Sequence, residues 1–252
     1  MKIHELEGHI QTIYLVEYPD KLLLLDGGCR CDVAVVRSYI EKDLQRTMAD
    51  LKLVVVTHMH PDHAGGARLY QKRYRIPVAS AKLDSQWYAG VKGSVQHNVD
   101  TLLAYWVAHR KKKSFRWLWY SKNLHPDVVL EDQQTLPGFD DWQVWSTPGH
   151  TDRDLSLLHP ESRLVYVADI MLKVKGKFIT PVPIKFPDRY RKTVKRLSQL
   201  SYGEVLMAHG GRCAVRGEDF LKLGHNVEET PQEYEVLIDI MKSFIKKTLT
   251  SR

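Results

Sequence analysis

The chain has 252 residues, of which 43% are hydrophobic, so a disordered protein is excluded and one large domain or two small ones are expected. Lys and Arg number 37 against 30 Asp and Glu, which gives a formal net charge of +7. No apolar run reaches the roughly 18 residues that a transmembrane helix needs, and the N-terminus lacks a secretory-signal pattern. Three cysteines cannot build a disulfide framework, so we expect a soluble, cytoplasmic protein.

The first third of the chain alternates short apolar runs with helix-like stretches. Strands are predicted at 10–18, 21–26, 52–58 and near 77–79. A helix is expected over 32–47, where apolar residues recur near every 3.6 positions, and another from about 65 to 74.

The rest of the chain begins with a segment, residues 82–122, that has no strand pattern and is predicted to be a helical excursion. Further strands are predicted at 142–147, 155–159, 163–169 and 204–209. Helices are predicted at 188–201 and, as a tail interrupted near Gly224 and Pro231, at 217–250. Strands in two groups, each flanked by helices, predict a layered α/β domain.

The positive charge is concentrated in residues 109–122, which read HRKKKSFRWLWYSK and contain six Lys and Arg but no acid. Aromatic residues, among them Trp117 and Trp119, are interleaved with these bases. Such a segment could contact nucleic acid or an anionic membrane surface, or cover a hydrophobic substrate. The simpler interpretation is a solvated helix whose aromatic side chains pack on the main domain.

The most specific pattern is Thr-His-Met-His-Pro-Asp-His at 57–63, directly after an apolar strand. Imidazole and carboxylate groups are the usual zinc ligands, and chance gives three His and one Asp at fixed positions only about 0.002 times in such a chain. In an extended strand exit, alternation puts His58 and His60 on one side. A turn at Pro61 then directs Asp62 and His63 toward a second position close by.

Three more ligand-type residues follow predicted strands. His150 lies in STPGHT, Asp169 ends the strand 163–169, and His209 ends the strand 204–209. Each alone is more often structural, but loops at strand ends commonly carry function. Together with 58–63 they provide five His and two Asp, enough for two metal ions.

These motifs, together with Asp26 in LLLLDGG, resemble the metallo-β-lactamase fold superfamily over about residues 10–212. The resemblance implies an αββα sandwich as a single domain over 1–252, with a helical insertion around 82–128. It implies that His58, His60 and His150 hold one metal ion and that Asp62, His63 and His209 hold another. By the same resemblance Asp169 bridges the two ions, and Asp26 orients a ligand histidine.

The resemblance predicts a hydrolase with two Zn²⁺ per chain, or iron or manganese, in which a metal-bridging hydroxide cleaves an ester, thioester or lactone. Asp62 could accept the proton of the nucleophile. The bridging carboxylate separates the chain from true β-lactamases and favours the glyoxalase II and lactonase-like branches. Leu172 stands where lactonases and nucleases of this fold often carry tyrosine, so the subfamily stays open.

Two other enzyme classes remain open, a phosphodiesterase or nuclease and a mononuclear iron enzyme that uses oxygen. The expected substrate is a small molecule, possibly anionic or acyl. Lys173, in an acid-free loop after Asp169, and Trp117 are the predicted substrate contacts. The sequence sets no oligomeric state.

Overall fold

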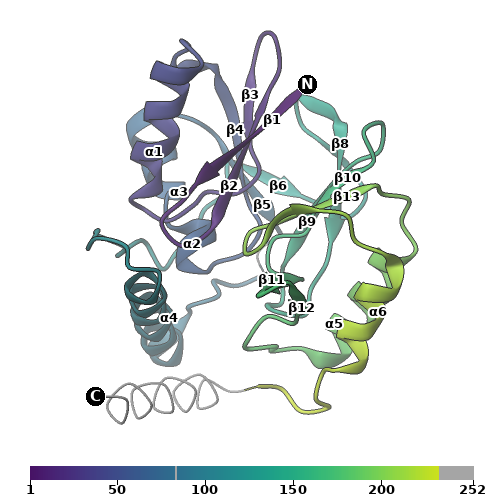
Figure 1. The fold of residues 1–252 in the computed structure, drawn as a ribbon. Coiled ribbons are helices and arrows are strands. Elements are labelled where there is room, and N and C mark those ends of the chain that lie inside the picture. The colour runs from purple at the N-terminus through teal and green to yellow at the C-terminus, as the bar shows by residue number, and fades with distance from the viewer. Residues whose placement is uncertain (83, 233–252) are drawn as a thin grey trace.

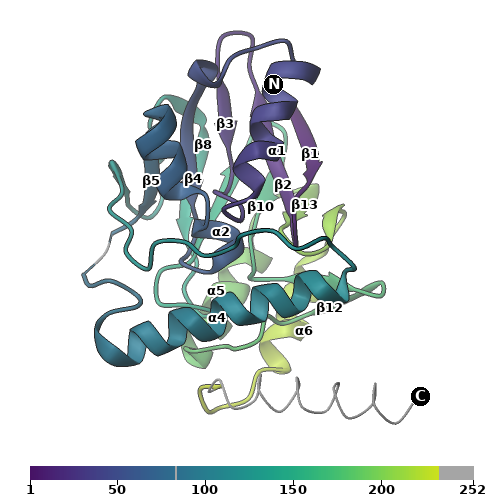
Figure 2. The same cartoon turned by 90° about the vertical axis from the view of Figure 1, so that its left-hand side faces the viewer.

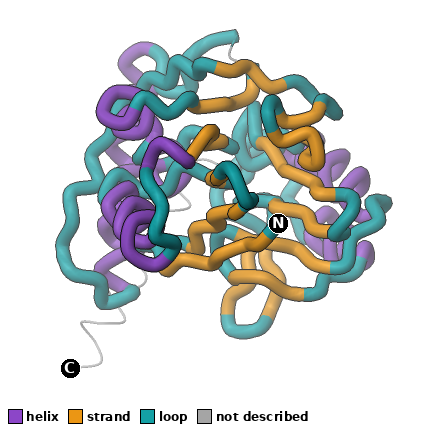
Figure 3. The backbone as a smooth tube through the Cα atoms, turned by 90° about the horizontal axis from the view of Figure 1, so that it is seen from above, coloured by secondary structure: helices purple, strands orange, loops and turns teal. Residues whose placement is uncertain are grey.

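The computed structural model describes residues 1–82 and 84–232 and shows two six-stranded sheets packed face to face between helices (Figures 1 and 3). The first sheet runs in the order β1 (Lys2–Glu7), β2 (Thr12–Glu17), β3 (Leu22–Leu24), β4 (Leu51–Val56), β5 (Val78–Ala81) and β6 (Val128–Leu130). The second runs in the order β14 (Gly211–Cys213), β13 (Glu204–Met207), β10 (Leu164–Tyr166), β9 (Leu155–His159), β8 (Phe139–Ser146) and β7 (Thr135–Leu136). This arrangement confirms the predicted αββα sandwich.

Helices cover both outer faces of the sandwich. The helices are α1 (Asp32–Ser38), α2 (Pro61–Ala64), α3 (Ala67–Leu69), α4 (Gly90–Arg110), α5 (Pro187–Ser198) and α6 (Gly217–His225). The first three lie on the first sheet, and α5 with α6 lies on the second (Figure 1). A separate hairpin of β11 (Leu172–Val174) and β12 (Lys177–Ile179) lies with α4 at one end of the sandwich (Figure 1).

The central strands are apolar on both faces because each face meets another layer. In β3 and the residue after it, Leu22 and Leu24 pack toward α1, whereas Leu23 and Leu25 pack between the sheets. In α5, Tyr190, Val194 and Leu197 are buried at helical spacing. Alternation at period two and amphipathicity at period 3.6 therefore produce the four layers.

Most predicted elements are present with shifted ends. The predicted helix 32–47 is shorter, because α1 ends at Ser38 and a π-helical turn follows at Tyr39–Asp43. The edge strand β1 was not predicted; it pairs antiparallel with β2. The hairpin β11–β12 corresponds to the acid-free lysine loop after Asp169.

Within the described part of the predicted insertion around 82–128, only the centre is helical, where α4 runs from Gly90 to Arg110. Figure 2 shows α4 crossing the end of the sandwich below α2. From residue 113 to residue 126 the chain has no helix, so the basic-aromatic segment 109–122 is not the predicted solvated helix. Of the predicted tail 217–250, α6 accounts for 217–225, and positions 233–252 lie outside the described residues.

Among the residues that the structure describes, no helix combines the length and the apolar character needed to cross a membrane.

Candidate metal centre

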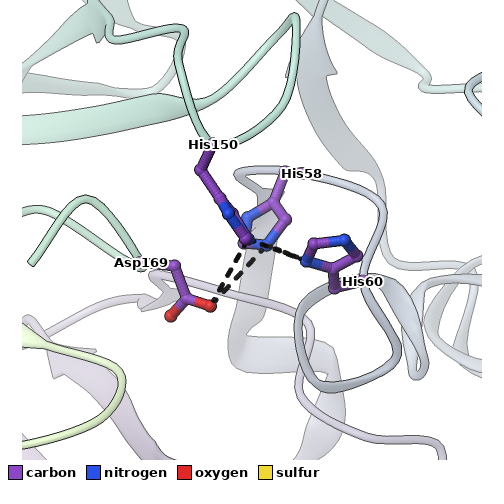
Figure 4. Close-up of side chains that lie close together, drawn as sticks. All are labelled: His58, His60, His150 and Asp169. Carbon is purple, nitrogen blue, oxygen red and sulfur yellow. Dashed lines mark hydrogen bonds and ion pairs between the residues drawn. The ribbon is translucent and has the colours of Figure 1, made fainter. Parts of the chain in front are cut away.

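Seven His and Asp side chains from distant parts of the chain meet at one end of the sandwich. Their donor atoms form two groups, and within each group the atoms lie within 4.8 Å of one another. One group is His58, His60, His150 and Asp169 (Figure 4), and the other is Asp62, His63 and His209. All seven predicted ligand residues are therefore brought together.

The loop after β4 supplies four of these side chains. His58 and His60 direct their donor atoms into the same group, as alternation predicts, and His60 has an extended backbone (φ −66°, ψ 157°). Pro61 then occupies the first position of α2, where its fixed φ suits a helix and its missing N–H costs nothing. This short helix carries Asp62 and His63 into the second group.

In the first group, three imidazole nitrogens converge. Nε2 of His58 lies 3.0 Å from Nδ1 of His60, and Nε2 of His150 lies 2.9 Å from that same atom. Burial and the neighbouring histidines lower the pKa of His60 to about 3. The ring is thus neutral at physiological pH, as a metal ligand must be.

Asp169 lies between the two groups and directs one oxygen to each. Oδ2 is 3.9 Å from Nε2 of both His58 and His150, and Oδ1 is 3.3 Å from Nε2 of His63 and 3.5 Å from Nε2 of His209. Burial opposes ionisation of Asp169, but the nearby histidines hold its pKa well below the usual range. The carboxylate is therefore an anion placed between both groups.

The donor set fits metal ions. Oδ1 of Asp169 and Nε2 of His63 are buried and have no hydrogen-bond partner within the described chain. Leaving such polar atoms unpaired costs stability unless something else contacts them. Imidazole nitrogens and carboxylate oxygens that converge within a few ångströms are the usual ligands of Zn²⁺ and are also used by iron.

Asp26, in the turn after β3, contacts His63 of the second group on the side of the ring away from Asp169. Its Oδ2 is 2.7 Å from Nδ1 of His63 and accepts hydrogen bonds from the hydroxyls of Thr57 (2.7 Å) and Tyr166 (2.9 Å). With Nδ1 occupied in this way, Nε2 of His63 faces Asp169. This contact has the geometry of a carboxylate that orients a ligand histidine, the role predicted for Asp26.

Asp154 holds the loop that carries His150, and sequence reasoning did not identify it. Its buried carboxylate accepts hydrogen bonds from the N–H groups of Gly149 (3.1 Å) and Thr151 (2.7 Å). Nδ1 of His150 lies 2.8 Å from the Pro183 carbonyl oxygen, which fixes the other side of the ring. The only sequence signal was an acid four residues after a candidate ligand, a weak one.

Side chains of the insertion contact the loop after β4, which carries His58, His60, Asp62 and His63. The hydroxyl of Tyr120 donates to the main-chain carbonyl of Met59, between His58 and His60, at 2.6 Å. The hydroxyl of Tyr88 donates to Oδ2 of Asp100 at 2.8 Å, and that oxygen lies 3.9 Å from Nε2 of His60. All three insertion side chains are buried, so part of the insertion belongs to the support of the centre.

A cavity of about 970 Å³ opens beside the donor groups and is bordered by His60, His150, Asp169 and His209. Lys111 and Lys173 also line it, from the insertion and from β11. The main-chain N–H of Lys173 donates to the carbonyl of His209 at 2.7 Å, which keeps this residue beside the centre. Lys173 therefore borders the cavity beside the donor groups, and its contact with substrate stays a prediction.

Trp117 does not line this cavity and is 62% exposed, so the structure does not place it near the centre. Phe115 and Trp119 are exposed as well, whereas Leu118 and Tyr120 between them are buried. A nucleic-acid or anionic-membrane partner for 109–122 stays a prediction.

The sequence profile of the metallo-beta-lactamase superfamily matches residues 6–209. The chain is 23% identical over 186 residues to the probable metallo-hydrolase YflN of Bacillus subtilis, a match that covers 73% of this chain and 69% of that protein.

Two solved structures share the fold at low sequence identity. TTHA1623, in a di-iron-bound form, superposes with a TM-score of 0.59 at 22% identity and covers 91% of this chain and 99% of its own. The metallo-beta-lactamase FIM-1 of Pseudomonas aeruginosa, in a mono-zinc form, superposes with a TM-score of 0.61 at 16% identity and covers 88% of each chain.

Proposed function

The chain belongs to the metallo-beta-lactamase superfamily, and from that premise we propose that it is a dinuclear metal-dependent hydrolase of a small ester, thioester or lactone. The observation that carries this proposal is the pair of donor groups with Asp169 between them, one oxygen toward each. Such an arrangement suits two ions held close together, as in the two-metal hydrolases.

In this proposal His58, His60 and His150 hold one ion, Asp62, His63 and His209 hold the other, and Asp169 contacts both. Bound ions would supply a water of lowered pKa and would polarise the carbonyl of the substrate. We propose zinc, with iron or manganese as the alternatives, because the nitrogen and oxygen donors suit all three. The similar structures include a mono-zinc and a di-iron form.

Asp62 is the proposed acceptor of the proton that the nucleophile loses. Burial would raise the pKa of Asp62, but His63 and His209 lower it to about 2. Its Oδ2 lies 3.0 Å from Nε2 of His209. The side chain of Gln11 donates to the main-chain carbonyl of Asp62 and so helps to fix its backbone.

The proposed reaction adds water across the acyl bond. A new carbon–oxygen bond forms at the carbonyl carbon, the bond to the leaving oxygen or sulfur breaks, and that atom takes up a proton. The products are a carboxylic acid and an alcohol or thiol; a lactone gives a single hydroxy acid.

The substrate is proposed to be a small anionic molecule. The volume of the cavity, about 970 Å³, is within the range of small-molecule sites. Lys111 donates to the carbonyl of Ile10, and burial lowers the pKa of its ammonium group. A cation held against the cavity wall in this way could bind a carboxylate or phosphate of the substrate, and Lys173 lines the same cavity.

The three free cysteines are compatible with the proposed cytoplasmic location.

A substrate panel of esters, thioesters and lactones tests the proposal, with chelated protein and with protein reloaded with zinc, manganese or ferrous iron. We expect hydrolysis of at least one class, loss on chelation and recovery on reloading. Cleavage of only an activated phosphodiester would favour the phosphodiesterase alternative. Oxygen consumption with one iron per chain and no hydrolysis would favour the oxygen-dependent alternative, and either result would overturn the proposal.

A further inference from the structure

A second, smaller cavity of about 170 Å³ adjoins the candidate metal centre. It shares the lining residues His60 and His209 with the larger cavity, and Asp62 also borders it. Val107 and Val182 also border both cavities, so the two spaces adjoin at these side chains as well as at the centre. A substrate whose reactive carbonyl lies at the metal centre can therefore extend into both spaces.

The wall of the small cavity is mostly apolar, and the insertion helix α4 supplies half of its apolar residues. Leu103, Trp106 and Val107 line it from α4, and Val182 and Pro183 line it from the segment between β12 and α5. Positions 103 and 107 are one helical turn apart, and 106 lies next to them on the same side of the helix. The neighbouring Leu102 does not line the cavity and is 63% exposed.

These apolar side chains are only partly buried, because Leu103, Trp106 and Val107 are intermediate in exposure and Val182 is 39% exposed. An apolar group that enters the cavity would remove this surface from water, which is favourable for each methylene buried. The carboxylate of Asp100 also borders the space, but it already accepts a hydrogen bond from Tyr88. The wall thus suits a hydrocarbon group better than a polar one.

The two cavities differ in chemistry on the two sides of the centre. Lys111 and Lys173 border the larger space, whereas no lysine or arginine lines the small one within the described chain. The charged leaving portion of a substrate therefore suits the larger space, and its apolar acyl portion suits the smaller one.

We infer that the cavity between α4 and Val182–Pro183 is an acyl subsite and that the substrate is an ester or thioester of a short-chain carboxylic acid. This inference rests on the proposed hydrolase function. At the ~30 Å³ that a water molecule occupies in the liquid, 170 Å³ holds roughly six non-hydrogen atoms. Butyryl and hexanoyl groups match this size, whereas longer chains exceed it.

The test is a series of acyl thioesters with one anionic leaving group, such as 4-mercaptobenzoate, from acetyl to decanoyl. The metal-loaded protein is assayed for kcat/KM with each member. We expect kcat/KM to rise about fourfold per methylene up to butyryl or hexanoyl and to fall beyond.

Variants of the wall then locate the subsite. Leu103→Trp fills the cavity and is expected to move the optimum to acetyl, whereas Val107→Ala enlarges it and is expected to move the optimum to longer chains. Leu102→Trp, one residue away on the exposed side, is the matched control and should leave the wild-type optimum in place. Melting temperature and metal content show whether each variant folds and loads normally.

The outcomes separate the two claims. Hydrolysis without dependence on chain length, or an optimum that Leu103→Trp and Val107→Ala both leave unchanged, would overturn the acyl subsite and leave the hydrolase function standing. No hydrolysis of any thioester, ester or lactone would overturn the proposed function itself.

Discussion

The candidate metal centre and the insertion over 82–128 contribute to the same end of the molecule in different ways. In the centre, the side chains with predicted chemistry all point inward, and His58, His63 and His150 are at most 2% exposed. In the insertion, the aromatic side chains divide between a buried side and a solvent-exposed side. Tyr88 and Tyr120 are buried beside the loop after β4, whereas Trp117 and Trp119 are exposed.

The difference shows that a residue's position relative to a strand predicts where its side chain lies better than the composition of its segment does. Each candidate ligand residue lies in the segment that follows a strand, so the sheets determine where it lies. The aromatic residues of 109–122 have no such constraint from a predicted element. Trp117, Leu118, Trp119 and Tyr120 alternate between exposed and buried, the pattern of an extended chain and not of a helix.

The largest effect is expected for Asp169→Asn, because this buried carboxylate faces both donor groups. The amide is neutral and keeps only one oxygen, so residue 169 can no longer direct an anionic oxygen to each group. Metal content should fall, and kcat/KM should drop by more than the ~10- to 100-fold typical for loss of an outer partner of a ligand. Plasma mass spectrometry and steady-state assays measure the two. Asp140→Asn, an exposed acid in β8, is the control and should retain both.

A smaller effect is expected for Asp26→Asn, which removes the charge beside Nδ1 of His63. We expect metal affinity to fall by about 10- to 100-fold, the usual cost of losing an orienting carboxylate. Competition with a chromogenic chelator measures the affinity. Tyr166→Phe removes only one hydrogen bond to the same carboxylate and should weaken affinity less. Equal affinities for wild type and Asp26→Asn would show that Asp26 does not support the centre.

Tyr120→Phe tests the inner side of the insertion. It removes the hydroxyl that donates to the Met59 carbonyl, so a buried acceptor keeps only the longer contact to Tyr88. The free energy of unfolding should fall by about 1–2 kcal/mol. Urea denaturation of the metal-free protein measures this change without any contribution from bound ions. An unchanged transition midpoint would show that the hydroxyl of Tyr120 does not stabilise the loop that carries His58 and His60.

The smallest effect is expected for Trp117→Ala on the outer side of the same segment. The indole is 62% exposed, so the free energy of unfolding should change by no more than about 0.5 kcal/mol. The same urea experiment provides the value. A loss as large as that of Tyr120→Phe would show that the two sides of the segment do not differ.

Local sequence was enough to predict which side chains the structure brings together at the candidate metal centre. His58, His60, Asp62 and His63 lie within six positions of the chain, and Asp26, His150, Asp169 and His209 each lie at or just after the end of a predicted strand. A strand end is a local feature that periodicity detects, and the fold family then orders these ends around one site.

The supporting contacts from Tyr88, Asp100 and Tyr120 could not be predicted in the same way. Tyr120 and Met59 are 61 residues apart, and no periodicity relates them. The strand β1 was missed as well, since its polar residues give an edge strand little apolar signal. Local patterns give elements and strand ends, whereas contacts between remote segments depend on packing that one sequence does not display.

The most direct test of the central claim, that seven side chains hold two metal ions, is a crystal structure of the metal-loaded protein with anomalous diffraction data at the metal edge. The account predicts two anomalous peaks, one among His58, His60 and His150 and one among Asp62, His63 and His209, with an oxygen of Asp169 contacting each. A single peak, or peaks outside these groups, would contradict it.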